Sequence, residues 1–276
     1  MKLFNKVAII GVGLIGGSLG LAIKKLRLAN EVIGVSRHKK TLLFAKRVRA
    51  IDTGVLDINI IKDADLIIFA TPVNTILELA GKISKLIKEG CLVTDVGSTK
   101  QEIVSKLDKL FPNYLGAHPL AGSEKRSIMS ASPDLFKGTL CILTPTKNTK
   151  AKVRRRMVGL WERLGARVIF SSADNHDKVI SYVSHLPHAI AFSLIDTMPI
   201  SYLKFSSSGL RDTTRIAASD SQLWADIFLS NEKNLISSIE HFQARLSKIK
   251  FAIKSNNKRQ LIKILAQAKK KREGLR

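Results

Sequence analysis

A glycine-rich hexapeptide near the start of the chain has the spacing that binds the phosphates of a dinucleotide. Gly11, Gly13 and Gly16 fit the pattern G-x-G-x-x-G, directly after an apolar run and at the start of a helical pattern. The first glycine permits a tight turn, the second lets the backbone approach a pyrophosphate, and the third allows close helix–strand packing. Free N–H groups at the helix start would then meet the phosphate oxygens. Because a β-α-β unit surrounds it, the motif predicts a dinucleotide site.

The end of the second predicted strand indicates which dinucleotide binds. A site selective for NAD places a carboxylate there, which accepts hydrogen bonds from the ribose hydroxyls. This chain instead has Ser36 and Arg37, followed by further basic residues, and these side chains suit a 2′-phosphate. We therefore predict NADP as the preferred cofactor, with NAD as the alternative if Arg37 only stacks on the adenine. The predicted cofactor contacts are Gly11, Gly13, Leu14, Ile15, Gly16, Ser36, Arg37 and Thr71.

Four motifs downstream of this segment agree with a single family. They are DVGSTK at 95–100, GAHPLAGSEK at 116–125, SHLPH at 184–188 and GLRDTTRIA at 209–217. Together with GVGLIGGSL they resemble the prephenate/arogenate dehydrogenases of tyrosine biosynthesis, and the resemblance spans nearly the whole chain. It implies a Rossmann domain followed by a helical domain that forms an intertwined dimer.

The resemblance implies a reaction in which prephenate, a cyclohexadienol, becomes 4-hydroxyphenylpyruvate. Hydride leaves C4 for the nicotinamide, the C4 hydroxyl loses its proton, and loss of CO2 makes the ring aromatic. Since positive charge builds up at C4, a neutral base must accept the proton, and imidazole suits this role near neutral pH. His118 matches the family's catalytic histidine. Ser98 resembles the serine that bonds this histidine and the substrate hydroxyl, although a helix cap would also explain it.

The other motif residues are expected to contact the substrate. Arg215 matches the family arginine that grips the substrate, and arginine binds a carboxylate bidentately. Arg211, four residues earlier, would share its helical face if the segment is helical. Further contacts implied by the resemblance are Ser184, His188, Glu124 and Trp224. The family tryptophan comes from the partner subunit, but Ser221 and Ala225 depart from the family pattern here.

The choice between prephenate and arogenate depends on one substituent, a keto oxygen in the first and an ammonium group in the second. His188 and Arg211 offer donors that suit a ketoacid side chain. Glu124 resembles an acid of prephenate-using relatives, although a carboxylate would equally attract the ammonium group. We predict prephenate as the substrate, with arogenate as the alternative.

Alternating strands and helices must position these residues in the first part of the chain. Apolar runs predict strands at 6–10, 31–35, 65–70, 92–95, 114–117, 140–143 and 167–170. Helical patterns separate the first strands, and Pro72 is well placed to begin one of the helices. Such alternation predicts a mostly parallel sheet covered on both faces. His118, directly after its strand, would then lie at the carboxyl edge of the sheet, where ligands bind.

The pattern changes after about Ser171. Helical periodicity dominates at 176–195, at 219–253 and again from Asn256, and Pro187 requires a kink or local irregularity. We predict an α/β Rossmann-type domain with a parallel sheet over 1–172, followed by an all-α substrate-binding and dimerisation domain over 173–276. Apolar positions between 220 and 253 recur at three- and four-residue steps, which predicts a partner helix and hence a homodimer.

Composition limits the functions that are open to the chain. Its 276 residues, 45% of them apolar, can form one large or two modest domains. Lys and Arg number 46 against 22 Asp and Glu, giving a net charge of +24, much of it in residues 245–276. Because only 6% of the residues are aromatic and they do not interleave with basic ones, nucleic acid is not an expected partner.

Cellular location follows from the cysteines and the absence of long apolar runs. Cys91 and Cys141 lie in apolar segments without CxxC spacing, which argues against a disulfide framework or a metal site and for a reducing compartment. No charge-free apolar run approaches 18 residues, and no signal-peptide pattern precedes the first strand. We therefore predict a cytoplasmic protein without a membrane span.

Two other functions stay open at this point. Another two-domain dehydrogenase, of the β-hydroxyacid or pyrroline-carboxylate type, would share the fold but lack the GAHPLAGSEK and SHLPH combination. A catalytically silent dinucleotide-binding or nucleic-acid-associated protein is the alternative from another class. The presence of both His118 and Arg215 argues against a catalytically silent protein.

Overall fold

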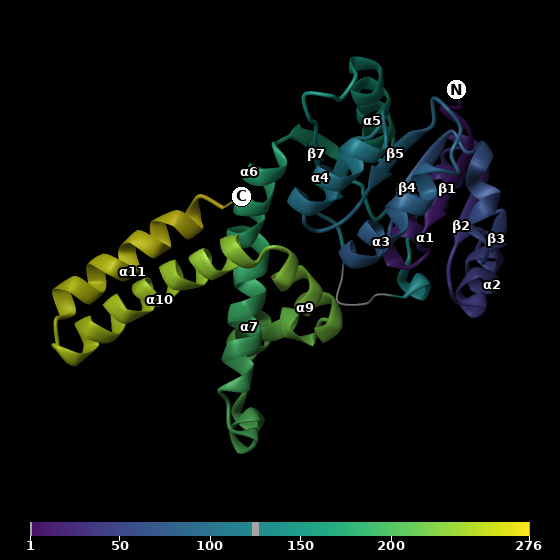
Figure 1. Cartoon of the computed structure of the whole chain (residues 1–276). Coiled ribbons are helices and arrows are strands. Elements are labelled where there is room, and N and C mark those ends of the chain that lie inside the picture. Colours follow the sequence, from purple (N-terminus) through teal and green to yellow (C-terminus); the bar gives the residue numbers. More distant parts are fainter. Residues whose placement is uncertain (1, 123–126, 276) are drawn as a thin grey trace. The chain divides into compact units, whose positions relative to one another are not determined.

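A five-stranded parallel sheet forms the first part of the structure, a computed structural model that describes residues 2–122 and 127–275 (Figure 1). The strands are β1 (Phe4–Ile10), β2 (Ala29–Val35), β3 (Thr53–Val55), β4 (Leu66–Phe69) and β5 (Leu92–Asp95). Between them lie α1 (Leu14–Lys25), α2 (Lys39–Arg47), the 3-10 segment η1 (Ile58–Asp63) and α3 (Val73–Ser84), with α4 (Gln101–Leu110) after β5. The order β3-β2-β1-β4-β5 reverses direction beside β1, which is the Rossmann arrangement.

Two hydrophobic clusters cover the opposite faces of this sheet. Successive side chains of a strand point to opposite faces. Val7 and Ile9 of β1 accordingly join the cluster that contains Leu19 of α1, while Ala8 and Ile10 join the cluster that contains residues of α3 and α4. The prediction of a parallel sheet covered on both faces is confirmed. The strand β3 was not predicted, because it has only three residues and none is buried.

A second sheet follows, and it corrects the predicted position of His118. It contains β6 (Gly116–Pro119), β7 (Leu140–Thr144) and β8 (Arg167–Phe170), with η2 (Ile128–Ser130) and α5 (Ala151–Arg163) between them. β6 pairs antiparallel with β7, whereas β7 and β8 are parallel. His118 therefore lies within a strand, opposite Ile142, and not directly after one at a parallel edge. The reason is that Leu115 and Asn113 still hydrogen-bond Val93 of β5, so the ladder with β7 begins only at Gly116.

From residue 173 onward every described element is helical, as predicted. The elements are α6 (Ala173–Ile180), the π-helical turn η3 (Ser181–His185), α7 (Leu186–Asp196), η4 (Ile200–Phe205), α8 (Ser208–Thr214), η5 (Arg215–Ala218), α9 (Ser221–Ser230), α10 (Glu232–Lys254) and α11 (Lys258–Glu273). The chain forms two compact units, Met1–Asn231 and Glu232–Arg276. The domain boundary near residue 172 stays a prediction. Within the described ranges, no helix has the length and apolar character needed to cross a membrane.

The periodic stretch 219–253 contains two helices, α9 and α10. It breaks at Asn231, whose backbone leaves the helical region at φ −129° and ψ 33°. The Asn231 side chain is buried, where its Nδ2 donates to the Asp177 carbonyl at 2.8 Å and lies 3.1 Å from His185 Nδ1. The residue at which α9 ends is therefore held by polar contacts with Asp177 and His185.

Candidate active site

The glycine turn between β1 and α1 leaves backbone open where a dinucleotide pyrophosphate would lie. Gly11 has φ +96°, and a Cβ there would lie 2.6 Å from the Ala70 carbonyl oxygen. A Cβ on Gly16 would lie 1.9 Å from the Gly11 oxygen, so only glycine fits both positions. Thr71 lies over the same turn, and its buried hydroxyl has no hydrogen-bond partner among the described residues. This turn and hydroxyl suit the phosphates of a dinucleotide.

The two residues predicted to select the cofactor follow the end of β2. The Ser36 hydroxyl accepts the His38 N–H at 3.2 Å, which fixes the turn into α2. Arg37 and the next three residues, two of them lysines, are exposed, and no acid occurs between 36 and 40. The side chains at the strand end are therefore hydroxyl and cationic groups.

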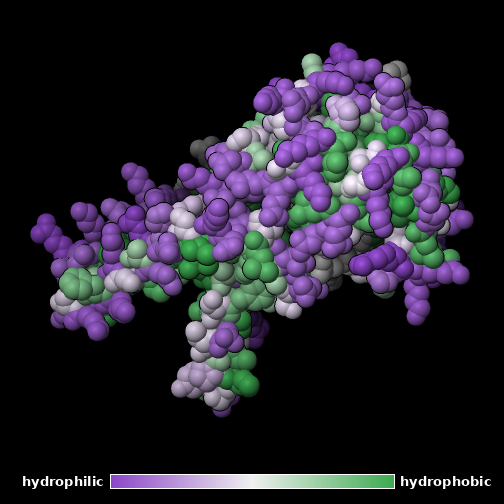
Figure 2. Space-filling view, viewed as in Figure 1, coloured by the Kyte–Doolittle hydropathy of each residue, from purple (hydrophilic) through white to green (hydrophobic). Residues whose placement is uncertain are grey.

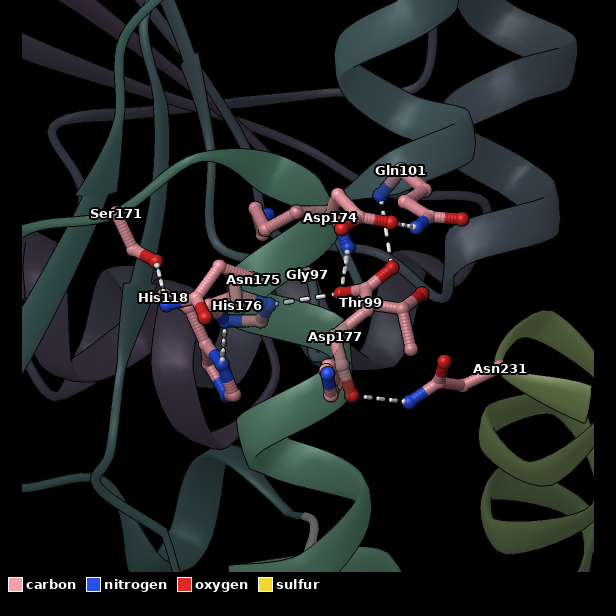
Figure 3. A network of polar contacts seen from close by, with 12 residues as sticks. Gly97, Thr99, Gln101, His118, Ser171, Asp174, Asn175, His176, Asp177 and Asn231 are labelled. Atoms are coloured by element: carbon pink, nitrogen blue, oxygen red, sulfur yellow. Dashed lines mark hydrogen bonds and ion pairs between the residues drawn. The ribbon is translucent and has the colours of Figure 1, made fainter. Parts of the chain in front are cut away.

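His118 is joined to a second histidine and an aspartate, neither of which was predicted to act (Figure 3). Its Nδ1 lies 2.8 Å from Nε2 of His176, and Nδ1 of His176 lies 2.7 Å from Oδ1 of Asp177. His176 and Asp177 are buried, each 1% exposed. Both come from α6, which begins after Ser172, whose hydroxyl accepts the Asn175 N–H at 3.1 Å. A polar chain thus runs from β6 to α6.

Asp177 also holds the start of α4. Its Oδ1 accepts the backbone N–H of Lys100 at 2.7 Å, and its Oδ2 accepts that of Gln101 at 2.9 Å. Asp174 accepts the Gln101 side-chain amide at 2.6 Å. A carboxylate at a helix N-terminus satisfies free N–H groups and opposes the positive end of the helix dipole. The loop that carries Ser98 is therefore anchored at its end by α6.

A fully buried ion pair lies beneath this loop. The Lys100 ammonium group pairs with Asp95, and both side chains have no exposed surface. Asp95 Oδ1 also accepts the Tyr114 hydroxyl at 2.7 Å, and its Oδ2 accepts the Gly97 N–H at 2.9 Å. These bonds compensate for the cost of burying the carboxylate. The motif DVGSTK thus has a structural core as well as the serine that sequence comparison singled out.

The electrostatics favour a neutral His118. Desolvation by burial is the largest cause that holds the pKa of His118 well below its ordinary value, and the charges of His176, Lys100 and His185 lower it further. Burial also lowers the pKa of His176, but the hydrogen bond to Asp177 opposes that effect. At neutral pH His118 is therefore an uncharged imidazole, the form that can accept a proton.

The π-helical turn confirms the irregularity expected at Pro187. The Leu186 N–H donates to the Ser181 carbonyl, five residues back, and Pro187 has no N–H to donate. Beyond the turn, His188 Nδ1 donates to the Ser184 carbonyl at 2.9 Å, and burial is the main cause that lowers the pKa of His188. The turn therefore fixes how the SHLPH residues face.

Trp224 and Arg215 lie beside His188 within the same chain. The rings of Trp224 and His188 stack with centroids 3.5 Å apart and planes 21° from parallel. The charge of Arg215 contributes to lowering the pKa of His188, which places the guanidinium near this ring. Arg211, one turn earlier on α8, is exposed. Contact of Trp224 with His188 needs no partner subunit, and a contribution of Trp224 to a partner's pocket stays a prediction.

Two predicted site residues lack the expected contacts in the described structure. Ser98 is half-buried, and no hydrogen bond joins it to His118, whose Nδ1 contacts His176 instead. Glu124 lies outside the described residues. The roles of both stay predictions.

His176, Asp177 and Lys100 are the residues that sequence reasoning missed. A signal was present, because His176 and Asp177 precede the buried Ile180 by four and three residues and so share its buried helical face. Polar residues on such a face need partners. The sequence does not reveal that those partners are His118 and the start of α4.

Comparisons with known proteins agree with this geometry. The model of the prephenate dehydrogenase nucleotide-binding domain matches residues 19–170, and that of the prephenate dehydrogenase dimerization domain matches 172–267. Cyclohexadienyl dehydrogenase of Zymomonas mobilis is 33% identical, over 100% of this chain and 98% of its own. Prephenate dehydrogenase of Lactococcus lactis is 35% identical over 98% of this chain and 77% of its own.

A solved structure is similar over nearly its whole length. Prephenate dehydrogenase from A. aeolicus, in complex with hydroxyphenyl propionate and NAD+, has a TM-score of 0.94 and 33% identity, covering 99% of this chain and 98% of that one. A (S)-3-hydroxybutyryl-CoA dehydrogenase from Ralstonia eutropha, with a TM-score of 0.52 and 14% identity, shares the fold alone. Both family models together cover most of the sequence, and the chain belongs to the prephenate dehydrogenase family.

Proposed function

We propose that this protein catalyses the oxidative decarboxylation of prephenate to 4-hydroxyphenylpyruvate, with NADP preferred as the hydride acceptor. The observation that carries the proposal is a neutral, half-buried imidazole, His118, in a chain of this family. Its Nδ1 is occupied by His176, which leaves Nε2 to face the substrate hydroxyl. The dinucleotide supplies the hydride acceptor, and the glycine turn with Thr71 would hold its phosphates.

The protein side chains divide the remaining work between proton transfer and charge recognition. His118 accepts the C4 hydroxyl proton as hydride leaves C4, and Ser98 would orient that hydroxyl. Arg215 holds a substrate carboxylate, with Arg211 and His188 as further donors. Burial, supported by the nearby charge of Arg215, lowers the pKa of His188, so this ring stays neutral beside the substrate. This neutral, hydrogen-bonding surface suits the ketoacid side chain of prephenate.

A two-by-two assay tests the function. Purified protein is given prephenate or arogenate with NAD or NADP, and the reduced nicotinamide and the aromatic product are both measured. We expect turnover with prephenate, faster with NADP. Arogenate turnover without prephenate activity would reverse the choice of substrate. Nucleotide binding without turnover of either substrate would instead support a silent dinucleotide-binding protein.

Replacing Ser36 by Asp is expected to shift the preference from NADP toward NAD. In the wild type, Ser36 and Arg37 would give one or two charge-assisted bonds to the 2′-phosphate, a preference of about tenfold to several-hundredfold. An aspartate would repel that phosphate and offer an acceptor to the ribose. Measurement of kcat/KM for both cofactors checks this, with Ser36→Ala as the neutral control. Equal kcat/KM for NAD and NADP in the wild type, or no shift in Ser36→Asp, would show that this turn does not recognise the 2′-phosphate of NADP.

We also propose that the helical segment forms a homodimer. Large apolar side chains are exposed along it, among them Val183 at 62%, Ile200 at 87%, Phe205 at 77% and Leu229 at 74%. Figure 2 shows apolar side chains over the segment that Figure 1 labels α7. Such surface is rarely left in contact with water. Light scattering is expected to give a dimer at micromolar concentration, and a monomer there would contradict the proposal.

The cytoplasmic location stays part of the proposal. Cys91 and Cys141 are buried free thiols, as suits a reducing compartment, and burial raises the pKa of Cys91 to about 12.

A further inference from the structure

In the hydrogen-bonded series His118–His176–Asp177, one placement of the protons satisfies every contact. Asp177 accepts backbone N–H bonds at both carboxylate oxygens, at the positive end of α4, so the carboxylate is the acceptor at this end of the series. An ionised carboxylate only accepts, so Nδ1 of His176 carries a proton that it donates to Asp177. Neutral His176 then has an unprotonated Nε2. His118 must donate its Nδ1 proton to that nitrogen, and its own Nε2 is left as the acceptor.

We propose that His176 and Asp177 are positioning residues that select this tautomer of His118 and take over the charge when His118 accepts a proton. The inference rests on the proposed function for the identity of the donor, a substrate hydroxyl. The O–H bond of the substrate breaks and an N–H bond forms at His118 Nε2. The Nδ1–H bond of His118 breaks and an N–H bond forms at His176 Nε2. The positive charge then lies on His176, next to the Asp177 carboxylate, and His118 is neutral again.

The reset reverses these transfers. When the product has left, His118 Nε2 releases its proton to water, and the proton on His176 Nε2 returns to Nδ1 of His118. No other reactant is needed, and both histidines end in their starting forms. His118 is better suited to the exchange with water, because the residue is half-buried, whereas His176 is 1% exposed.

The charged groups around the pair favour this direction of transfer. Lys100, from the loop before α4, and His185, from the π-helical turn, oppose a cation on His118. Asp177 on α6 and Asp95 at the end of β5 favour a cation on His176, while Lys100 opposes it. Of the two rings, His176 is the one that a carboxylate of the described residues contacts directly, Asp177 at 2.7 Å. The imidazolium is therefore better accommodated one ring away from the substrate.

Two substitutions of His176 separate orientation from proton uptake. His176→Phe retains a buried ring but can neither accept from His118 nor hold a proton. We expect kcat to fall about 10²-fold, less than the roughly 10⁴-fold loss found when the aspartate that orients a catalytic histidine is replaced by asparagine. His176→Gln offers an amide oxygen to the His118 Nδ1–H but takes up no proton, so its kcat should lie between that of the wild type and that of His176→Phe. KM for the substrate and Kd for the cofactor should stay within about twofold, since the His176 side chain is buried and hydrogen-bonded within the protein.

The pH profile gives a readout that mere structural damage would not. In the wild type the two histidines titrate as a coupled pair, and the first proton goes to His176 beside Asp177. Both substitutions remove that more basic member, which leaves the low pKa of His118 alone. The acid limb of kcat/KM should therefore move to lower pH in both variants. An unchanged limb and unchanged kcat in both would overturn the proposal.

The tautomer can be read without any turnover, which separates this inference from the proposed function. In protein with 15N-labelled histidine, the six histidines are few enough to assign by single substitutions. We expect His118 to carry its proton on Nδ1 in the wild type and in His176→Gln, and to lose that preference in His176→Phe. The matched control is His185→Gln. His185 is also buried but is not part of the hydrogen-bonded series His118–His176–Asp177, so this substitution should leave the His118 tautomer unchanged. A wild-type His118 protonated on Nε2 would overturn the inference even if the enzyme is active.

Discussion

The His118→Asn variant is expected to lose turnover by roughly 10²–10⁴-fold, the usual contribution of a positioned general base. Asparagine retains a polar side chain on β6 but cannot accept a proton. Residue 118 lies in β6, and the backbone pairing of β6 with β7 does not depend on this side chain. The fold and cofactor affinity should therefore be retained. Stopped-flow or steady-state measurement of nicotinamide reduction at saturating substrate gives the loss in kcat.

A matched control uses a histidine that belongs to none of the family motifs. His241 lies exposed on α10, and His241→Asn should turn over at the wild-type rate. Circular dichroism and cofactor titration on both variants then show whether the change is chemical. Near-normal turnover of His118→Asn with intact secondary structure would remove His118 from the role of base.

Arg215→Ala is expected to raise KM for the substrate by about tenfold to a hundredfold, the loss of one charge-assisted contact of about 1.5–3 kcal/mol. The carboxylate is present in both the ground state and the transition state, so kcat should change by much less. Initial rates over a wide range of substrate concentration separate the two parameters. Arg215 begins η5 on the surface, so its truncation should not unfold the protein.

A charge-conserving substitution sharpens this test. Lysine at 215 keeps the positive charge but cannot bind a carboxylate with two parallel bonds, and its KM should lie between wild type and alanine. An unchanged KM in Arg215→Ala would contradict the proposed carboxylate contact. Equal values for lysine and alanine would indicate that bidentate geometry matters more than charge.

The elements of the first part could be predicted because their patterns are local. The apolar run of β1 and the glycine turn after it fix a strand and a helix within the first 25 residues, and the strand at 167–170 was placed at its observed bounds. Errors arose where distant partners decide the outcome. β6 begins two residues later than expected because residues 113–115 bond to β5, and that shift moved His118 into a strand.

The same distinction applies to the site. The residues in motifs could be found from sequence because resemblance compares short segments. The contact of His118 with His176 joins residues 58 positions apart, and that of Lys100 with Asp177 joins residues 77 apart. No local periodicity encodes such distances. Asn231, whose side chain ends one helix by bonding another, could not be foreseen for the same reason.

The π-helical turn between α6 and α7 sets the rotational phase of everything beyond it. One residue of an α-helix advances the side-chain direction by about 100°, so the wider turn shifts each later position by that angle relative to an uninterrupted helix. In this shifted phase the His188 ring stacks on the Trp224 ring. A related protein could have a regular α-helix in place of the π-helical turn. It would keep the same side-chain directions beyond the turn only if it also had one residue fewer between 181 and 185. Gaps of a single residue in this stretch of homologous helices would then leave the direction of the residues after the turn unaltered.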